Sequence, residues 1–280
     1  MARRPRSRHG SRLHARAPIA DDAPMPPRTV TATRYVTPLR EGGSLPAIIE
    51  AGDEGLYVLK FRGAGQGPRA LIAELVAGEI GRALGLPVPE IVFVELDPDL
   101  ARTEPDAEIQ HLIRASAGLN VALDYLPGSI TFDPLVDRPD PDLASRVVWF
   151  DALVSNVDRT ARNTNMLVWH RRLHLIDHGA ALYFHHDWDG YRERSRQPFA
   201  RIKDHVLLPL ADRLARVDEA LAQQLTPAVL AGIVDAIPDG WLDATAPFAD
   251  PAAQRDAYRD YLTRRLEAPR AFVEEAIRAR

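Results

Sequence analysis

The stretch from Trp149 to Leu182 constrains this chain more than any other. It opens with an apolar run that predicts a helix, crosses a polar turn, and continues as two short apolar strands. The turn holds Asp158 and Asn163, and Asp177 stands at the end of the second strand. This order predicts a catalytic loop followed by a metal-binding aspartate.

Phosphoryl transfer from a nucleotide to an alcohol needs these three residue types. Asp158 would accept the proton of the hydroxyl group, while Asn163 and Asp177 would hold Mg²⁺ with the hard oxygen ligands that it requires. The order matches the kinase pattern of D-x-x-x-x-N followed by a strand and a second aspartate. The alternative is that Asp and Asn are ordinary turn residues. Three of the chain's four asparagines, Asn156, Asn163 and Asn165, crowd into this loop, which favours the functional interpretation.

Two motifs carry a resemblance to a known family. N-x-D-R-x-x-x-N spans 156–163, and L-I-D-H-G-A-A-L spans 175–182. Together they resemble the HipA-like kinase family, a bacterial branch of the protein-kinase-like fold, over residues 34–280. The resemblance implies an α+β, bilobal fold with a small, mostly β N-lobe at 29–124 and a hinge and larger, mostly helical C-lobe at 125–280. Aminoglycoside phosphotransferase-like and phosphoinositide-kinase-like enzymes share this skeleton.

The first predicted strands supply candidates for nucleotide binding. Three short strands are expected, with Gly42, Gly43 and Ser44 in the first connection and Lys60 on the third strand. In a kinase, backbone amides of such a loop approach the phosphates, and the lysine pairs with the α and β phosphates. A plain turn is the alternative for the glycines, and a second glycine-rich loop at 63–67 is another candidate. For Lys60 the alternative is a surface cation, but this chain uses 33 arginines and only two lysines, and an ammonium differs from a guanidinium at a phosphate.

A helix predicted at 69–86 carries two glutamates that are candidates to hold Lys60 in place. We prefer Glu74, whose A-E-L-V context is similar to the family, and we expect Glu79 on an exposed face. A later strand ends before Pro127 and Gly128, where the resemblance places the hinge. The residues expected to meet adenine through their backbone are Asp124, Tyr125 and Leu126.

Two further residues stand beside the motif positions. Arg159 follows the candidate base and is expected to be structural or near the phosphates. His178 replaces the phenylalanine that follows the metal aspartate in the general kinase pattern, and we expect it to pack rather than to bind metal. The histidines at 170, 174, 178, 185 and 186 do not form a convincing metal site, because the first three lie in a predicted hairpin and would not converge.

Composition limits the classes of partner. The first twenty residues contain six arginines and no acid, so the 29 basic and 39 acidic residues of the remainder give it a net charge near −10, which disfavours nonspecific nucleic-acid binding. Residues 1–28 are predicted to be a disordered tail, with Met25 as an alternative start; a transit peptide or nucleic-acid arm is the other interpretation. Cysteine is absent, and no apolar run is long enough for a membrane span, so we expect a cytoplasmic protein without disulfides.

The resemblance implies ATP, Mg²⁺ and a hydroxyl-bearing acceptor, with a protein serine or threonine favoured. It also implies that some members pair with a DNA-binding antitoxin, although nothing in the sequence encodes that pairing. The alternatives are a small-molecule kinase of the aminoglycoside or choline type, and a pseudokinase that binds nucleotide as a regulatory module.

Overall fold

The computed structural model describes residues 25–39, 45–65 and 67–280. Most of the predicted tail, as well as Gly42, Gly43 and Ser44, lies outside the described residues. The described chain combines strands and helices, which confirms the α+β class.

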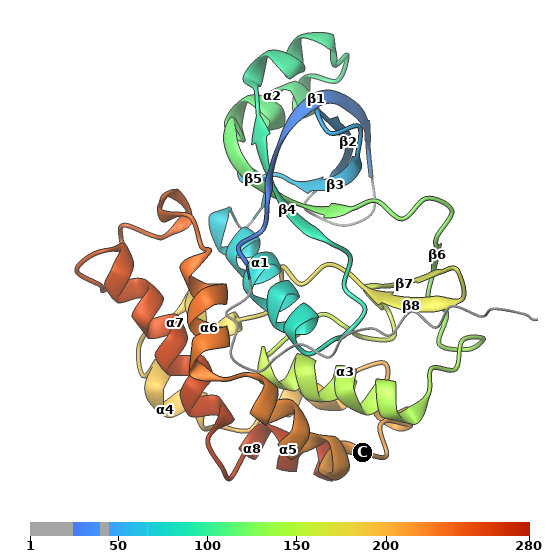
Figure 1. The fold of residues 1–280 in the computed structure, drawn as a ribbon, viewed down its shortest axis with the longest axis vertical. Coiled ribbons are helices and arrows are strands. Elements are labelled where there is room, and N and C mark those ends of the chain that lie inside the picture. The colour runs from blue at the N-terminus through green and yellow to red at the C-terminus, as the bar shows by residue number, and fades with distance from the viewer. Residues whose placement is uncertain (1–24, 40–44, 66) are drawn as a thin grey trace, which may run out of the picture.

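Five strands close into a barrel at one end of the molecule (Figure 1). They are β1 (Thr29–Pro38), β2 (Ala47–Ala51), β3 (Leu56–Lys60), β4 (Ile91–Leu96) and β5 (Gly118–Asp124). The order around the barrel is β1-β2-β3-β5-β4. Neighbours are antiparallel except β1 and β4, which run parallel with Val30 opposite Val94. Inward-facing apolar side chains such as Ile49 and Leu59 fill the barrel and form its own core.

Helix α1 (Pro68–Ala83) joins the barrel to the helical part of the molecule (Figure 1). It begins after Gly67, which adopts a positive φ of 65°, and has a proline in its first turn. Its middle turns are buried on all sides, because α1 contacts β4 and β5 on the barrel and α6 among the helices. This burial fixes the position of the one charged residue at its centre, Glu74.

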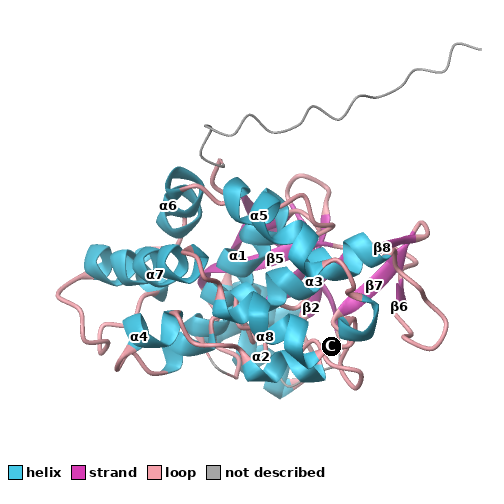
Figure 2. Cartoon of the chain, turned by 90° about the horizontal axis from the view of Figure 1, so that it is seen from below, coloured by secondary structure: helices cyan, strands magenta, loops and turns pink. Residues whose placement is uncertain are grey.

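Most of the remaining helices gather at the other end of the molecule (Figures 1 and 2). They are α3 (Pro141–Leu153), α4 (Tyr191–Ser195), α5 (Leu214–Gln224), α6 (Pro227–Asp235), α7 (Pro251–Leu266) and α8 (Ala271–Ala279). Short 3₁₀ turns connect them: η2 (Tyr183–His186), η3 (Ala200–Asp204), η4 (Leu208–Leu210) and η5 (Asp239–Trp241). Trp149 of α3 is fully buried and packs edge to face against Phe272 of α8, which ties the helices together.

A second, three-stranded sheet lies on the side of the molecule away from α4 and α7 (Figures 1 and 2). Its strands are β6 (Ile130–Thr131), β7 (Met166–Trp169) and β8 (Arg172–Leu175). β7 and β8 form the hairpin predicted after the polar turn, and the turn itself connects α3 to β7. The β7–β8 hairpin therefore forms the middle of the segment from Asp158 to Asp177, with Asp158 before it and Asp177 after it.

The connection between β4 and β5 is rich in acidic residues and is folded. It forms η1 (Pro98–Thr103) and helix α2 (Ala107–Ala115). The Asp106 side chain caps α2 by accepting a hydrogen bond from the Glu108 amide, and Ile109 and Ile113 bury one narrow face on the barrel core. None of the helices within 25–39, 45–65 and 67–280 is long and apolar enough to cross a membrane.

Candidate active site

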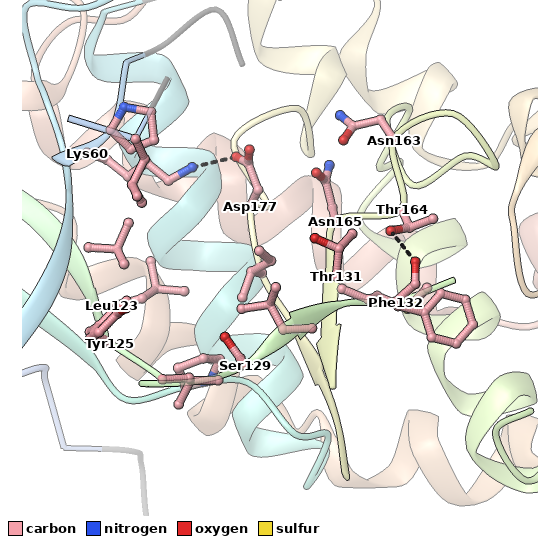
Figure 3. A pocket seen from close by; sticks show the side chains of 18 of the residues that line it. Lys60, Leu123, Tyr125, Ser129, Thr131, Phe132, Asn163, Thr164, Asn165 and Asp177 are labelled. Carbon is pink, nitrogen blue, oxygen red and sulfur yellow. Dashed lines mark hydrogen bonds and ion pairs between the residues drawn. The ribbon is translucent and has the colours of Figure 1, made fainter. Parts of the chain in front are cut away.

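A cleft of about 1030 Å³ opens where the barrel meets the β6–β8 sheet and the predicted catalytic loop. Its apolar wall includes Val58, Leu123, Met166 and Ile176. Its polar residues include Lys60, Asn163, Asn165 and Asp177 (Figure 3). Residues from four distant segments of the sequence therefore share one cavity.

Lys60 points from β3 toward the aspartate that ends the predicted motif. Its Nζ lies 2.6 Å from Asp177 Oδ1 and 3.6 Å from Glu74 Oε2 (Figure 3 shows the first contact). Burial alone would lower the pKa of the Lys60 ammonium, but the charges of Glu74 and Asp177 outweigh it and raise the pKa. Lys60 is therefore a positive charge held at the edge of the cleft.

Glu74 lies behind Lys60 and is only 1% exposed. Both of its carboxylate oxygens accept a hydrogen bond from the His178 backbone N–H at 3.1 Å, and Oε1 lies 3.2 Å from His178 Nδ1. Burial acts to raise the pKa of Glu74, but the Lys60 charge and the bonds from His178 lower it. The other candidate glutamate, Glu79, pairs with Arg82 on the same helix, so the structure places Glu74 beside the lysine.

The candidate base is held by two asparagines. Asp158 Oδ2 accepts hydrogen bonds from Asn163 Nδ2 at 2.7 Å and from Asn165 Nδ2 at 3.2 Å. Both asparagines line the cleft, whereas Asp158 lies just behind them. Sequence reasoning missed the role of Asn165, although its place in the asparagine-rich loop was a usable signal.

The predicted catalytic loop rests on a buried group of charges. Asp151 of α3 accepts hydrogen bonds from Arg159 Nε at 2.6 Å and Asn156 Nδ2 at 2.9 Å, and it lies 2.9 Å from His205 Nε2. Burial would raise the pKa of Asp151, but the Arg159 charge and the His205 bond lower it. Arg159 is 1% exposed and also donates to the Asn165 carbonyl, so the structure gives it the structural one of its two predicted roles.

Two residues of the site adopt left-handed backbone conformations. Asp177 has a φ of 54° and Asn165 a φ of 47°. Asp and Asn tolerate this region better than other residues with a Cβ, and such conformations cluster at functional sites. Asp177 and Asn165 therefore suit the backbone conformation at these two points of the site.

The predicted hinge residues line the cleft, but two of their amides are already bonded. The Asp124 N–H donates to the Glu90 carbonyl at 2.8 Å, and the Tyr125 N–H donates to the Leu56 carbonyl at 3.0 Å. A nucleotide would therefore have to use the carbonyls of this segment or the amide of Leu126. Burial raises the pKa of the Asp124 carboxyl, because that side chain is turned partly out of water.

The oxygen donors at the cleft fit a hard divalent cation. The Asp177 side chain is 40% exposed, and the Asn163 Nδ2 bond to Asp158 leaves the Asn163 amide oxygen available. Carboxylate and amide oxygens are the ligands that Mg²⁺ prefers, usually with water and phosphate oxygens completing the shell. Within the part of the chain that the structure describes, no group of three or more His, Asp or Glu side chains could hold a metal ion.

Comparisons with known proteins give one family and several remote structures. A family model described as HipA-like kinase matches residues 33–270. No curated protein sequence matches the chain. Among solved structures, the Golgi casein kinase with Mn/ADP bound is similar at 12% identity over 92% of this chain and 74% of that chain, with a TM-score of 0.49. The Helicobacter pylori proinflammatory kinase CtkA is similar at 14% identity over 89% of this chain and 98% of that chain, with a TM-score of 0.47.

Proposed function

The chain belongs to the HipA-like kinase family, as its motifs predicted, and we propose that it transfers the terminal phosphoryl group of ATP to a protein serine or threonine. The observation that carries the proposal is the convergence of Lys60, Asn163 and Asp177 on one cleft, with Glu74 behind the lysine and Asp158 behind the asparagine. Phosphoryl transfer depends on positioning and on stabilisation of charge, and these residues provide both.

Each residue has a role in the proposed reaction. Lys60 binds the α and β phosphates, and Glu74 keeps its ammonium in place. Asp158 accepts the proton of the acceptor hydroxyl while that oxygen bonds to the γ-phosphorus and the bond from the γ-phosphorus to ADP breaks. Asn163 and Asp177 would hold Mg²⁺, which supplies charge neutralisation at the phosphates. Phe132 and the apolar wall would exclude water from the adenine side of the cleft.

The same proposal assigns the lobes and the cell compartment. The barrel with α1 is the N-lobe, 29–124, and the helical part is the C-lobe, 125–280, with the nucleotide bound between them. The Asp124 carbonyl and the Leu126 backbone contact adenine, since the other hinge amides are occupied. We place the enzyme in the cytoplasm, where ATP and protein acceptors are both available.

The test is transfer from γ-labelled ATP with Mg²⁺ to the protein itself, to cell lysate and to small alcohols. Asp158→Ala should lower transfer about 10²- to 10⁴-fold, the usual contribution of a general base, while MgATP binding is kept. Asp99→Ala, an exposed acid on η1, is the matched control and should be fully active.

Phosphoserine or phosphothreonine in the protein or lysate would support the protein acceptor. Labelling of small alcohols alone would replace it with a small-molecule acceptor. MgATP binding without any transfer would show a pseudokinase, and full activity of Asp158→Ala would remove the base assignment.

A further inference from the structure

We propose that His178 is a positioning residue that fixes Glu74, and through Glu74 the phosphate-binding Lys60. The inference rests on the proposed function and deepens it. It assigns a role to the one position where this chain departs visibly from the general kinase pattern, the residue after the metal-binding aspartate.

The bonds between His178 and Glu74 are the first observation. A single residue supplies contacts to both carboxylate oxygens: its backbone N–H lies 3.1 Å from each, and Nδ1 lies 3.2 Å from Oε1. The two residues lie 104 positions apart in the chain and are 0% and 1% exposed. Water cannot take over these bonds, so a lost donor here leaves part of a buried carboxylate unsatisfied.

The chemistry of the pair sets the position of the imidazole proton. A charged carboxylate only accepts hydrogen bonds, so Nδ1 carries the proton that it donates to Glu74. Nε2 is buried and has no hydrogen-bond partner among the described residues. The ring therefore has one polar task within the described structure, which is to hold Glu74.

The surroundings of the ring keep it in that orientation. It packs edge to face against Phe150 of α3, with ring centroids 5.7 Å apart. It also faces α1 at Gly78, one turn after Glu74, where an added Cβ would lie in ordinary van der Waals contact with Nδ1, at 3.9 Å, and would clash with the Ile91 side chain. The imidazole thus lies between α1 and α3. A phenylalanine side chain could fill the same space, but it has no N–H to donate, so Glu74 would keep only the backbone N–H of residue 178.

The consequence concerns the partner of Lys60. In the structure the ammonium is closer to Asp177, at 2.6 Å, than to Glu74, at 3.6 Å. A cation bound at the phosphates would also take up the Asp177 carboxylate. Lys60 would then need a second carboxylate in a fixed place. Because His178 follows Asp177 directly, one short segment sets the positions of both carboxylates that contact the lysine.

Variants of matched shape test this role. His178→Asn keeps a side-chain N–H donor near the Nδ1 position, whereas His178→Leu has a similar volume without a side-chain donor, and His178→Phe restores a ring without one. All three variants keep the backbone N–H that bonds Glu74, so they test the Nδ1 contact alone. We expect His178→Leu and His178→Phe to raise the Kd for MgATP about 10- to 100-fold, the range for a hydrogen bond to a charged group. His178→Asn should stay within about threefold of the unsubstituted protein. His174→Asn should leave the Kd unchanged. Among the described residues, the His174 ring on β8 has one hydrogen-bond partner, the carbonyl of Arg172 on the same strand.

A double-mutant cycle separates action through Glu74 from a general packing role. In a Glu74→Gln background, His178→Leu should weaken MgATP binding by less than about twofold further, because the charged partner is gone. Equal impairment of His178→Asn and His178→Leu, or an unchanged Kd in His178→Leu, would overturn the inference. Absence of MgATP binding in the unsubstituted protein would overturn the proposed function instead. If His178→Phe does not fold, the comparison of the MgATP Kd values of His178→Asn and His178→Leu still tests the inference.

Discussion

Two ion networks flank the proposed catalytic loop, and only one of these two reaches the cleft. The cleft network consists of Lys60, Glu74, Asp177 and His178; the anchor network consists of Asp151, Asn156, Arg159 and His205. Both contain a carboxylate that is fully or almost fully buried, but the Asp177 side chain is 40% exposed, whereas the side chains of Asp151 and Arg159 are 0% exposed. A ligand can therefore change the partners of the first network and not those of the second.

The choice of cation follows this difference. Arg159 uses its planar fork to bond Asp151 and the Asn165 carbonyl at once, which suits a fixed joint. Lys60 presents one compact charge that the carboxylates of Glu74 and Asp177 share. Such a charge can leave one carboxylate for a phosphate while it stays close to the other. Position in the fold thus separates Arg159, which shapes the proposed catalytic loop, from Lys60, which we propose binds phosphate.

The largest expected effect lies in the anchor network. Asp151→Ala leaves the Arg159 guanidinium buried without its counterion, so the free energy of unfolding should fall by about 3–5 kcal/mol in urea titrations. Asp151→Leu combined with Arg159→Met removes both charges and should recover most of this loss, while the catalytic loop still lacks the bond from Arg159 to Asn165. A loss below about 1 kcal/mol in Asp151→Ala would show that the two networks do not differ as described.

The cleft network should respond in activity more than in stability. Lys60→Met should reduce phosphoryl transfer about 10²- to 10³-fold, the range for losing one preorganised electrostatic contact. Its free energy of unfolding should fall less than that of Asp151→Ala, because Glu74 keeps its bonds from His178. Lys60→Arg should not restore activity. Equal losses of stability in Lys60→Met and Asp151→Ala would contradict the comparison.

His185 shows what burial does to an ionisable side chain that has no carboxylate partner among the described residues. Burial first, and then the charges of His186 and Arg69, lower the pKa of His185 to about 3, against about 6.5 in an unfolded chain. Between these values the unfolded state binds a proton that the folded state does not, so His185 reduces stability as pH falls, by at most about 1.4 kcal/mol per pH unit. His185→Gln should therefore lose less stability than the unsubstituted protein between pH 7 and pH 5.

Urea unfolding at the two pH values measures this effect. The comparison is His186→Gln at the neighbouring, more exposed position. Burial also lowers the pKa of His186, so this variant should lose part of the pH dependence, but less of it than His185→Gln. An identical pH dependence in His185→Gln and the unsubstituted protein would show that His185 does not contribute to it.

The smallest effect is expected where the charges face water. Arg28 contacts Asp53 at 2.5 Å and Glu90 at 2.9 Å, with the Arg28 and Asp53 side chains 45% and 34% exposed. Solvent and salt screen such contacts, so Asp53→Asn should change the free energy of unfolding by less than about 1 kcal/mol. A change as large as that of Asp151→Ala would mean that burial does not govern these energies.

Local sequence signals predicted the elements that carry the site. The third strand with Lys60, the helix with Glu74 and the hairpin before Asp177 are all present, because each has a clear apolar period and clear turn residues. Helix α2 was not predicted, because its apolar face consists of two buried residues, Ile109 and Ile113. Two apolar positions are too few to indicate a helical period. The cap residue Asp106 was the available signal.

Contacts between distant segments could not be predicted in this way. Closure of the barrel depends on the parallel pairing of β1 with β4, and no local pattern encodes it. The bond from His178 to Glu74 spans 104 positions, so the sequence predicted only that the histidine packs. The occupied amides of Asp124 and Tyr125 likewise depend on where neighbouring segments run.

The parallel pairing of β1 with β4 also determines how the barrel tolerates shortening. β1 bonds to β2 on one side and to β4 on the other, so its removal would expose two strand edges at once. Exposed edges recruit strands from other molecules, and such a shortened chain should form aggregates. A version that begins at Met25 retains β1 from Thr29 onward and should therefore remain monodisperse at high concentration.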